Sequence, residues 1–358
     1  MSADPYPALL RGVLAGHHLS SEAMASTIGA IMDETLSAVR AAALLAALAA
    51  KGETVEEVVG AARAMRERSV RVEHGLPLVL DVVGTGGDNA HTINISTMAA
   101  FVVAGCGVPV AKHGNRAASS ACGSADVLEA LGVKIDRSPE ASARVLREHG
   151  IAFLFAQRHH PAMRAVAPIR RELGVRTVFN VLGPLTNPAG ANRQLIGVAR
   201  PEHVGLVADA LRALGAEAGA VIHGEDGLDE ISGEAPTDVV QFDRGGVRHW
   251  TLNPADYGVH ASRAEIRGGD AHENAAAVLA ILGGERSPRA DLVRLNAALA
   301  LVVAGEAVDL HDGMARAATS IETGRARAAL DALRAGETGS TAADASTGSG
   351  QAALRMTT

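Results

Sequence analysis

The sequence predicts an α/β protein: a small all-helical domain, followed by a larger domain whose mostly parallel sheet is flanked by helices. Two observations predict this fold. Residues 1–75 carry only helical patterns of apolar residues, whereas short apolar strands alternate with helices from residue 76 to about residue 335. A chain of 358 residues is also long enough for two domains.

The helical domain is predicted to hold four helices. The fourth begins with a capping box, in which Thr54 is the N-cap and Glu57 occupies the third helical position. The first three are expected at residues 7–16, 20–32 and 35–50.

The larger domain is predicted from apolar runs that end at turns. Strands are expected at 78–83, 108–112, 151–155, 195–199 and 218–222, with a hairpin of 239–242 and 247–252 at one edge. Helices are expected at 96–104, 125–131, 139–150 and 202–214, and then at 271–282, 288–304, 310–323 and 325–334.

One insertion interrupts the alternation of strands and helices. Residues 161–191 are long for a crossover, so we expect them to complete the helical domain of residues 1–75. The α/β domain is then 76–160 with 192–335, and the Gly-, Ala-, Ser- and Thr-rich tail 336–358 is predicted to be disordered.

Composition excludes several classes of protein. A net charge of −7 without a long basic run, and only 2% aromatic residues, argue against a dedicated nucleic-acid binder. The two cysteines, Cys106 and Cys122, are too few for a disulfide framework, and Met1-Ser2-Ala3-Asp4-Pro5 does not resemble a signal peptide. We therefore expect a cytoplasmic protein without a membrane span.

A glycine-rich loop follows the first predicted strand. In Asp81–Asp88, three of four consecutive positions after Val83 are glycine, and the hydroxyl-rich segment Thr92–Thr97 then begins a helix. Glycine lets the backbone approach an anion, and N–H groups at a helix start point towards it, so this layout predicts a phosphate site. An ordinary tight turn is the alternative.

Two more polar segments follow strand ends of the same sheet. Lys112 and Arg116 offer positive charge, and the uncharged donors of residues 115–120 suit a second phosphate. Asp229 and Glu230, with the Ser96 hydroxyl, suit Mg²⁺, which takes one or two carboxylates plus substrate phosphates. The alternatives are a polar loop and a solvated acidic pair.

Arginine residues in the insertion and two histidines just before it suggest contacts with a substrate. Arg170 could bind a carboxylate in bidentate fashion, although an ion pair with Glu172 is as good an explanation. Adjacent histidines point in different directions, so His159 and His160 predict one histidine that lines a pocket rather than a metal pair.

Together these motifs resemble the anthranilate phosphoribosyltransferase family over residues 5–335. The resemblance rests on seven segments in a fixed order: Gly84–Asp88, Asn94–Thr97, Lys112–Arg116, Gly123–Asp126, Arg176–Asn180, Gly183–Pro188 and Asp229-Glu230. It implies a nucleoside phosphorylase/phosphoribosyltransferase-like fold and a homodimer joined through the helical domain. It also implies transfer of the phosphoribosyl group of 5-phosphoribosyl 1-diphosphate to the amine of anthranilate, a step of tryptophan biosynthesis.

The resemblance also assigns roles to individual residues, with no residue acting as a nucleophile or general base. Mg²⁺, implied as two ions per subunit, would be held by Ser96, Asp229 and Glu230. Anthranilate would meet Gly84, Asn115, Arg170 and His160. The phosphoribosyl donor would be contacted by Gly84, Gly87, Asp88, Thr92, Asn94, Ile95, Ser96, Thr97, Lys112, His113, Gly114, Asn115, Arg116, Ala117, Ala118, Ser119, Ser120 and Ser124.

Three other functions compete with this one. A pyrimidine nucleoside phosphorylase of the same fold lacks the Lys112–Asn115 motif. A nucleic-acid-binding relative without transferase activity should have a basic cleft and a degraded acidic pair, but Asp229-Glu230 is intact. An interaction protein that uses only its helical domain leaves the phosphate loops unexplained.

Overall fold

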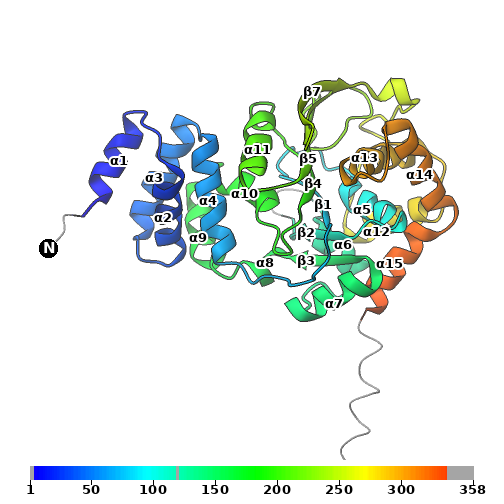
Figure 1. The fold of residues 1–358 in the computed structure, drawn as a ribbon, viewed down its shortest axis with the longest axis horizontal. Helices are drawn as coiled ribbons and strands as arrows, with labels where there is room; N and C mark the ends of the chain where they lie inside the picture. The colour runs from blue at the N-terminus through cyan, green and yellow to red at the C-terminus, as the bar shows by residue number, and fades with distance from the viewer. Residues whose placement is uncertain (1–3, 118–120, 337–358) are drawn as a thin grey trace, which may run out of the picture.

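The computed structural model describes residues 4–117 and 121–336. Figure 1 shows a helical lobe beside a larger lobe built around one sheet. The amino-terminal helices of the small lobe are α1 (Tyr6–Leu14), α2 (Ser21–Met32), α3 (Ala38–Lys51) and α4 (Val55–Glu67). The predicted α/β fold class, with its small helical lobe, is therefore confirmed.

The capping box of α4 is formed as predicted. The Glu57 N–H donates to the Thr54 hydroxyl over 3.3 Å, and the Glu57 carboxylate accepts from the Thr54 N–H over 2.8 Å. Lys51 also pairs with that buried carboxylate at 2.9 Å. Helix α3 begins three residues later than predicted, at Ala38, because Ser37 has extended backbone and occupies its N-cap position.

The sheet has seven strands in the order β3-β2-β1-β4-β5-β6-β7. The first five strands run parallel, and the last two form an antiparallel hairpin at one edge, as predicted. The bounds are β1 (Leu80–Gly84), β2 (Val110–Gly114), β3 (Ile151–Phe155), β4 (Arg193–Gly197), β5 (Ala218–Gly224), β6 (Thr237–Asp243) and β7 (Gly246–Leu252).

Helices cover both faces of the sheet. One hydrophobic cluster joins β1, β2 and β3 to the helices that lie to the right of the sheet in Figure 1, with Phe101 and Phe153 among its largest fully buried side chains. The helices of this lobe, with one 3₁₀ turn, are α5 (Ile95–Gly105), α6 (Ser124–Ala130), α7 (Pro139–His149), α11 (Glu202–Ala213), η1 (Pro254–Tyr257), α12 (Ala271–Leu282), α13 (Pro288–Ala304), α14 (Leu310–Glu322) and α15 (Arg325–Ala335).

The insertion at 161–191 carries helices that pack against the small lobe. After the short α8 (Ala156–His159), α9 (Met163–Leu173) and α10 (Phe179–Leu185) share one hydrophobic cluster with α2, α3 and α4. The same cluster continues through α11 onto one face of the sheet, so the two lobes are joined by apolar packing. No helix within the described ranges is long and apolar enough to cross a membrane.

Candidate active site

The site is built at the edge of the sheet where the parallel strands end. The loops after β1, β2 and β5 meet there, because carboxyl ends of parallel strands lie on the same side. Asp229, in the loop after β5, accepts a hydrogen bond of 2.6 Å from the Gly86 N–H in the loop after β1. The acidic pair and the glycine loop, 143 residues apart in sequence, therefore form one structure.

Glycine is required where Asp229 enters the site. Gly84 and Gly197 are paired across β1 and β4, and a Cβ on either would overlap Asp229. Gly87 has φ +80°, a conformation that favours glycine, and Arg176 lies against its Cα. These glycines therefore make room for the charged side chains of Asp229 and Arg176.

Glu230 and Lys112 connect the acidic pair to the other two loops. The Glu230 carboxylate accepts from the Ser96 N–H over 3.0 Å, so it caps the first turn of α5. Lys112 Nζ donates to the Val82 carbonyl over 2.6 Å and lies 3.4 Å from the Ser96 hydroxyl. The three polar segments that the sequence predicts for the site, represented by Gly84–Asp88, Lys112 and Asp229-Glu230, thus lie together.

Crowded acidic side chains dominate this side of the site. Burial raises the pKa of Asp229 well above its ordinary value, and the nearby charges of Asp88 and Glu230 raise it further. Burial also raises the pKa of Glu230 to about 7, although Lys112 opposes the shift. Burial lowers the pKa of Lys112. Crowded carboxylates with one partly neutralising lysine are stabilised by a cation.

The residues present suit Mg²⁺ better than a metal held by protein alone. The described part of the chain contains no group of three or more His, Cys, Asp or Glu side chains arranged to hold a metal. Asp229 and Glu230 supply two carboxylates, Glu230 lies against Ser96, and Mg²⁺ ordinarily takes one or two carboxylates together with water and substrate phosphates.

Three residues that are predicted to contact the phosphoribosyl donor lie around the start of α5. Asn94 accepts from the Asn274 amide over 2.9 Å and donates to the Cys122 carbonyl over 3.2 Å. The side chains of Ile95 and Thr97 are buried, and the Thr97 hydroxyl has no hydrogen-bond partner among the described residues.

The loop after β2, which is predicted to bind a second phosphate, is closed by Asp126. One oxygen of this carboxylate accepts from the N–H groups of Ala117 and Gly123, both over 2.9 Å. Arg116 points towards Asp126 and Glu129, at 3.0 and 2.8 Å, so its charge is paired with these two carboxylates in this structure. The predicted ligands Ala118, Ser119 and Ser120 lie outside the described residues.

The remaining residues that are predicted to bind the phosphoribosyl donor lie around these loops. Asn115 is exposed and accepts from the Arg116 N–H over 2.8 Å, and Thr92 forms a bridge with Arg267. Gly114 lies against Ser124, whose hydroxyl is 3.4 Å from the Asn115 carbonyl.

Two buried histidines face each other beside the second loop. The rings of His113 and His160 lie 5.1 Å apart, and His113 Nδ1 donates to the Gly183 carbonyl over 3.1 Å. Burial lowers the pKa of His160 to about 4 and that of His113 well below its usual value, so both rings are neutral at pH 7. His159 instead bonds the Val70 carbonyl, so the adjacent histidines do point in different directions.

Two arginines from the insertion lie near this region. Arg170, the predicted carboxylate ligand, lies with its guanidinium 5.9 Å from the centre of the Phe179 ring. Arg176 begins the family motif Arg176–Asn180 but was given no role of its own, and its Nε and Nη2 are buried without a hydrogen-bond partner in the described structure. Burial lowers the pKa of both guanidinium groups, and the charge of Arg176 contributes to the shift of Arg170.

Asp81 is another residue for which no role was predicted from the sequence. It is fully buried, and its carboxylate accepts from the Asn187 amide over 2.8 Å and the His113 N–H over 3.2 Å. Burial raises the pKa of Asp81 to about 6. Asp81 thereby ties Asn187, at the end of the insertion, to the strand that carries Lys112 and His113.

Comparisons with known proteins agree with this architecture. Residues 7–69 match the helical bundle domain of a glycosyl transferase family, and residues 76–327 match its α/β domain. A relative from Desulfatibacillum aliphaticivorans, anthranilate phosphoribosyltransferase, is 50% identical over 91% of this chain and 96% of its own. The chain belongs to the anthranilate phosphoribosyltransferase family. The resemblance seen in the motifs is thus confirmed.

Solved structures of this family have the same fold. The anthranilate phosphoribosyltransferase of Thermus thermophilus superposes with a TM-score of 0.87 at 45% identity, over 91% of this chain and 98% of that one. The enzyme of Saccharomyces cerevisiae, solved in complex with PRPP and Mg, gives a TM-score of 0.86 at 28% identity, over 94% and 98% of the two chains.

Proposed function

We propose that this protein transfers the phosphoribosyl group of 5-phosphoribosyl 1-diphosphate to the amine of anthranilate, giving N-(5-phosphoribosyl)anthranilate and diphosphate for tryptophan biosynthesis. The observation that carries the proposal is the meeting of Asp229 and Glu230 with the glycine loop and Lys112 at one sheet edge. A phosphate-binding loop beside crowded carboxylates suits a metal-bound sugar diphosphate. The relative from Saccharomyces cerevisiae was solved with PRPP and Mg, which supports this choice.

The acidic side would bind the sugar diphosphate. Ser96, Asp229 and Glu230 would hold Mg²⁺, and the family resemblance implies two ions per subunit. When bound, Mg²⁺ acts as a Lewis acid that stabilises charge on the leaving diphosphate. Lys112 and the backbone N–H groups of the glycine loop would hold the phosphates in place, and this positioning lowers the barrier.

The opposite side would bind anthranilate. Arg170 would pair with the carboxylate, and Asn115, Gly84 and His160 would line the ring and orient the amine. His160 and His113 are held neutral by burial, so they leave the amine unprotonated and add no competing charge. The aromatic amine is weakly basic and already nucleophilic, so no side chain needs to act as a general base.

We also propose a cytoplasmic homodimer joined through the helical lobe. Leu14 on α1 and Val39 on α3 are 68% and 80% exposed, and Cys106 and Cys122 are both unpaired, as expected in a reducing compartment. Light scattering should give twice the 36.6 kDa chain mass, and the Leu14→Glu/Val39→Glu variant should give the monomer mass. Val308→Glu, 87% exposed on the other lobe, is the control. A monomeric wild type would contradict the proposal.

The reaction is tested by following anthranilate fluorescence in purified protein. Fluorescence should fall only when both 5-phosphoribosyl 1-diphosphate and Mg²⁺ are present, with one diphosphate released per anthranilate consumed. No loss with both present would overturn the proposal. Phosphorolysis of uridine or thymidine by the same sample would instead support the pyrimidine nucleoside phosphorylase.

A further inference from the structure

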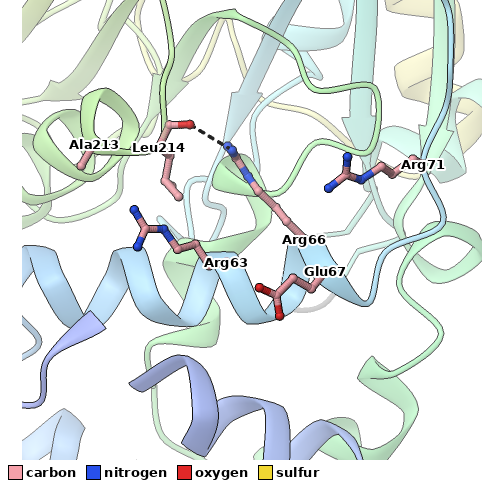
Figure 2. Close-up of a pocket in the computed structure, with 6 residues that line it drawn as sticks. All are labelled: Arg63, Arg66, Glu67, Arg71, Ala213 and Leu214. Atoms are coloured by element: carbon pink, nitrogen blue, oxygen red, sulfur yellow. Dashed lines mark hydrogen bonds between the residues drawn. The ribbon is translucent and has the colours of Figure 1, made fainter. Parts of the chain in front are cut away.

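A second charged feature lies away from the active site, between α4 and the end of α11. A surface pocket of about 250 Å³ is lined by three arginines, Arg63, Arg66 and Arg71, with Glu67, Ala213 and Leu214. In Figure 2, Arg63 and Arg66 extend from the same side of α4, and Arg71 reaches towards them from the chain that follows. The carboxylate of Glu67 points away from these guanidinium groups.

Arg66 holds the pocket together but has only neutral partners. Its Nε donates to the Leu185 carbonyl over 2.7 Å and its Nη1 to the Leu214 carbonyl over 3.3 Å. Burial lowers the pKa of Arg66, and the charge of Arg71 adds to this effect. The guanidinium is thus desolvated and repelled without a carboxylate to balance it.

The nearby negative charge does not neutralise the three arginines. Glu67 lies 3.7 Å from Arg68, which is outside the pocket, and no ion pair joins Arg63, Arg66 or Arg71 to a carboxylate of the described residues. The carboxyl ends of α4 and α11 carry about half a negative charge each. Even with Glu67 and both helix ends counted, about one positive charge remains unbalanced.

We propose that this pocket binds a small phosphate-class anion, inorganic phosphate or diphosphate. Guanidinium groups match phosphate oxygens with paired hydrogen bonds. The pocket is smaller than the usual range for larger organic ligands, which favours a small anion. Because α4 belongs to the helical lobe and Leu214 follows α11 of the sheet domain, the anion would stabilise the junction between the lobes.

Hydrogen–deuterium exchange of the full chain tests this site separately from the active site. Phosphate at ten times its Kd should slow exchange about tenfold in peptides covering 63–71, since the slowing equals 1 + [L]/Kd. Peptides covering 84–96 report the active site independently. Equal protection by sodium chloride at the same ionic strength, or none by phosphate, would overturn the proposal.

Charge-removing variants complete the test. Arg63→Gln/Arg71→Gln removes two exposed charges that make no ion pair in the described structure, so folding and turnover should be unchanged while phosphate protection is lost. Arg11→Gln/Arg286→Gln removes the same charge elsewhere and should keep the protection. The single Arg71→Gln variant should weaken the protection by phosphate, and because Arg71 lies after the end of α4 it should leave that helix unaltered. Undiminished protection in both pocket variants would refute the site.

Diphosphate and inorganic phosphate distinguish the source of the ligand. Stronger protection of 63–71 by diphosphate would support a site for the product of the proposed reaction. Equal protection would support a site for phosphate in general.

Discussion

The two sides of the active site solve opposite electrostatic problems. On the acidic side, Asp88, Asp229 and Glu230 crowd together, and burial together with the charge of Asp88 raises the pKa of both Asp229 and Glu230. On the side formed by the insertion, His113 and His160 are neutral, and the guanidinium of Arg170 lies over the Phe179 ring. One side needs a cation and the other has positive charge to offer. This difference is what a metal-bound diphosphate and an aromatic carboxylate require of one pocket.

Removing the acidic charges should have the largest effect. In Asp229→Asn/Glu230→Gln, turnover should fall by at least about 1000-fold, because metal stabilisation of the leaving group is worth several kcal/mol. The rate should no longer depend on Mg²⁺, measured by anthranilate fluorescence. Glu225→Gln, on the exposed part of the same loop, is the control. Metal dependence like that of wild type would refute the metal assignment.

Removing one charge from the opposite side should affect one substrate only. Arg170→Ala should raise the KM for anthranilate about 10- to 100-fold, because a hydrogen bond to a charged group contributes about 1.5–3 kcal/mol. The KM for 5-phosphoribosyl 1-diphosphate should hardly change. Arg171→Ala, the exposed neighbour on α9, should leave both constants unchanged. Equal increases in both KM values for Arg170→Ala would remove its assigned role.

A substitution that displaces the backbone of Asp229 tests whether the position of this carboxylate matters as well as its charge. Gly197→Ala places a Cβ against the backbone of Asp229, and overpacking of this kind costs about 1–3 kcal/mol. Denaturant unfolding should show that loss, and the Mg²⁺ concentration for half-maximal rate should rise. Gly205→Ala on α11 has open space around it and should not destabilise the protein. An unaltered Mg²⁺ requirement in a folded Gly197→Ala protein would contradict this account.

Asp81 should reveal itself through pH. The pKa of Asp81 is raised from 3.8 to about 6 in the folded protein. Between these two values the folded state binds more protons than the unfolded state, so the free energy of unfolding falls as the pH rises through this range. Asp81→Asn lacks this loss. The difference in unfolding free energy, wild type minus variant, should therefore fall by about 2 kcal/mol between pH 4 and pH 7. A difference independent of pH would contradict the assignment.

The fold and the three loop segments of the site could be predicted from the sequence, because both depend on residue patterns within short stretches of the chain. Strand β3 and helices α12 and α13 lie at their predicted bounds, since apolar runs and caps specify them. Helix α10 was missed because Gly183 and Pro184, both poor helix formers, lie inside it.

Other features depend on side chains that are distant in sequence. Asp81 meets Asn187 across 106 residues, and Arg176 reaches Gly87 from the insertion. Arg116 was predicted as a phosphate ligand from its type and place, but its direction is decided by Asp126 and Glu129 on α6. No pattern within a short window indicates such pairings.

The division of the site into two sides is tested most directly by a crossed kinetic measurement. Both substrates are varied for Arg170→Ala and for Ser96→Ala, with anthranilate fluorescence as the readout. We predict that Arg170→Ala raises only the KM for anthranilate, and that Ser96→Ala raises only the KM for 5-phosphoribosyl 1-diphosphate and the Mg²⁺ requirement. If each variant raised both KM values equally, the two sides would not be separate and the account would be wrong.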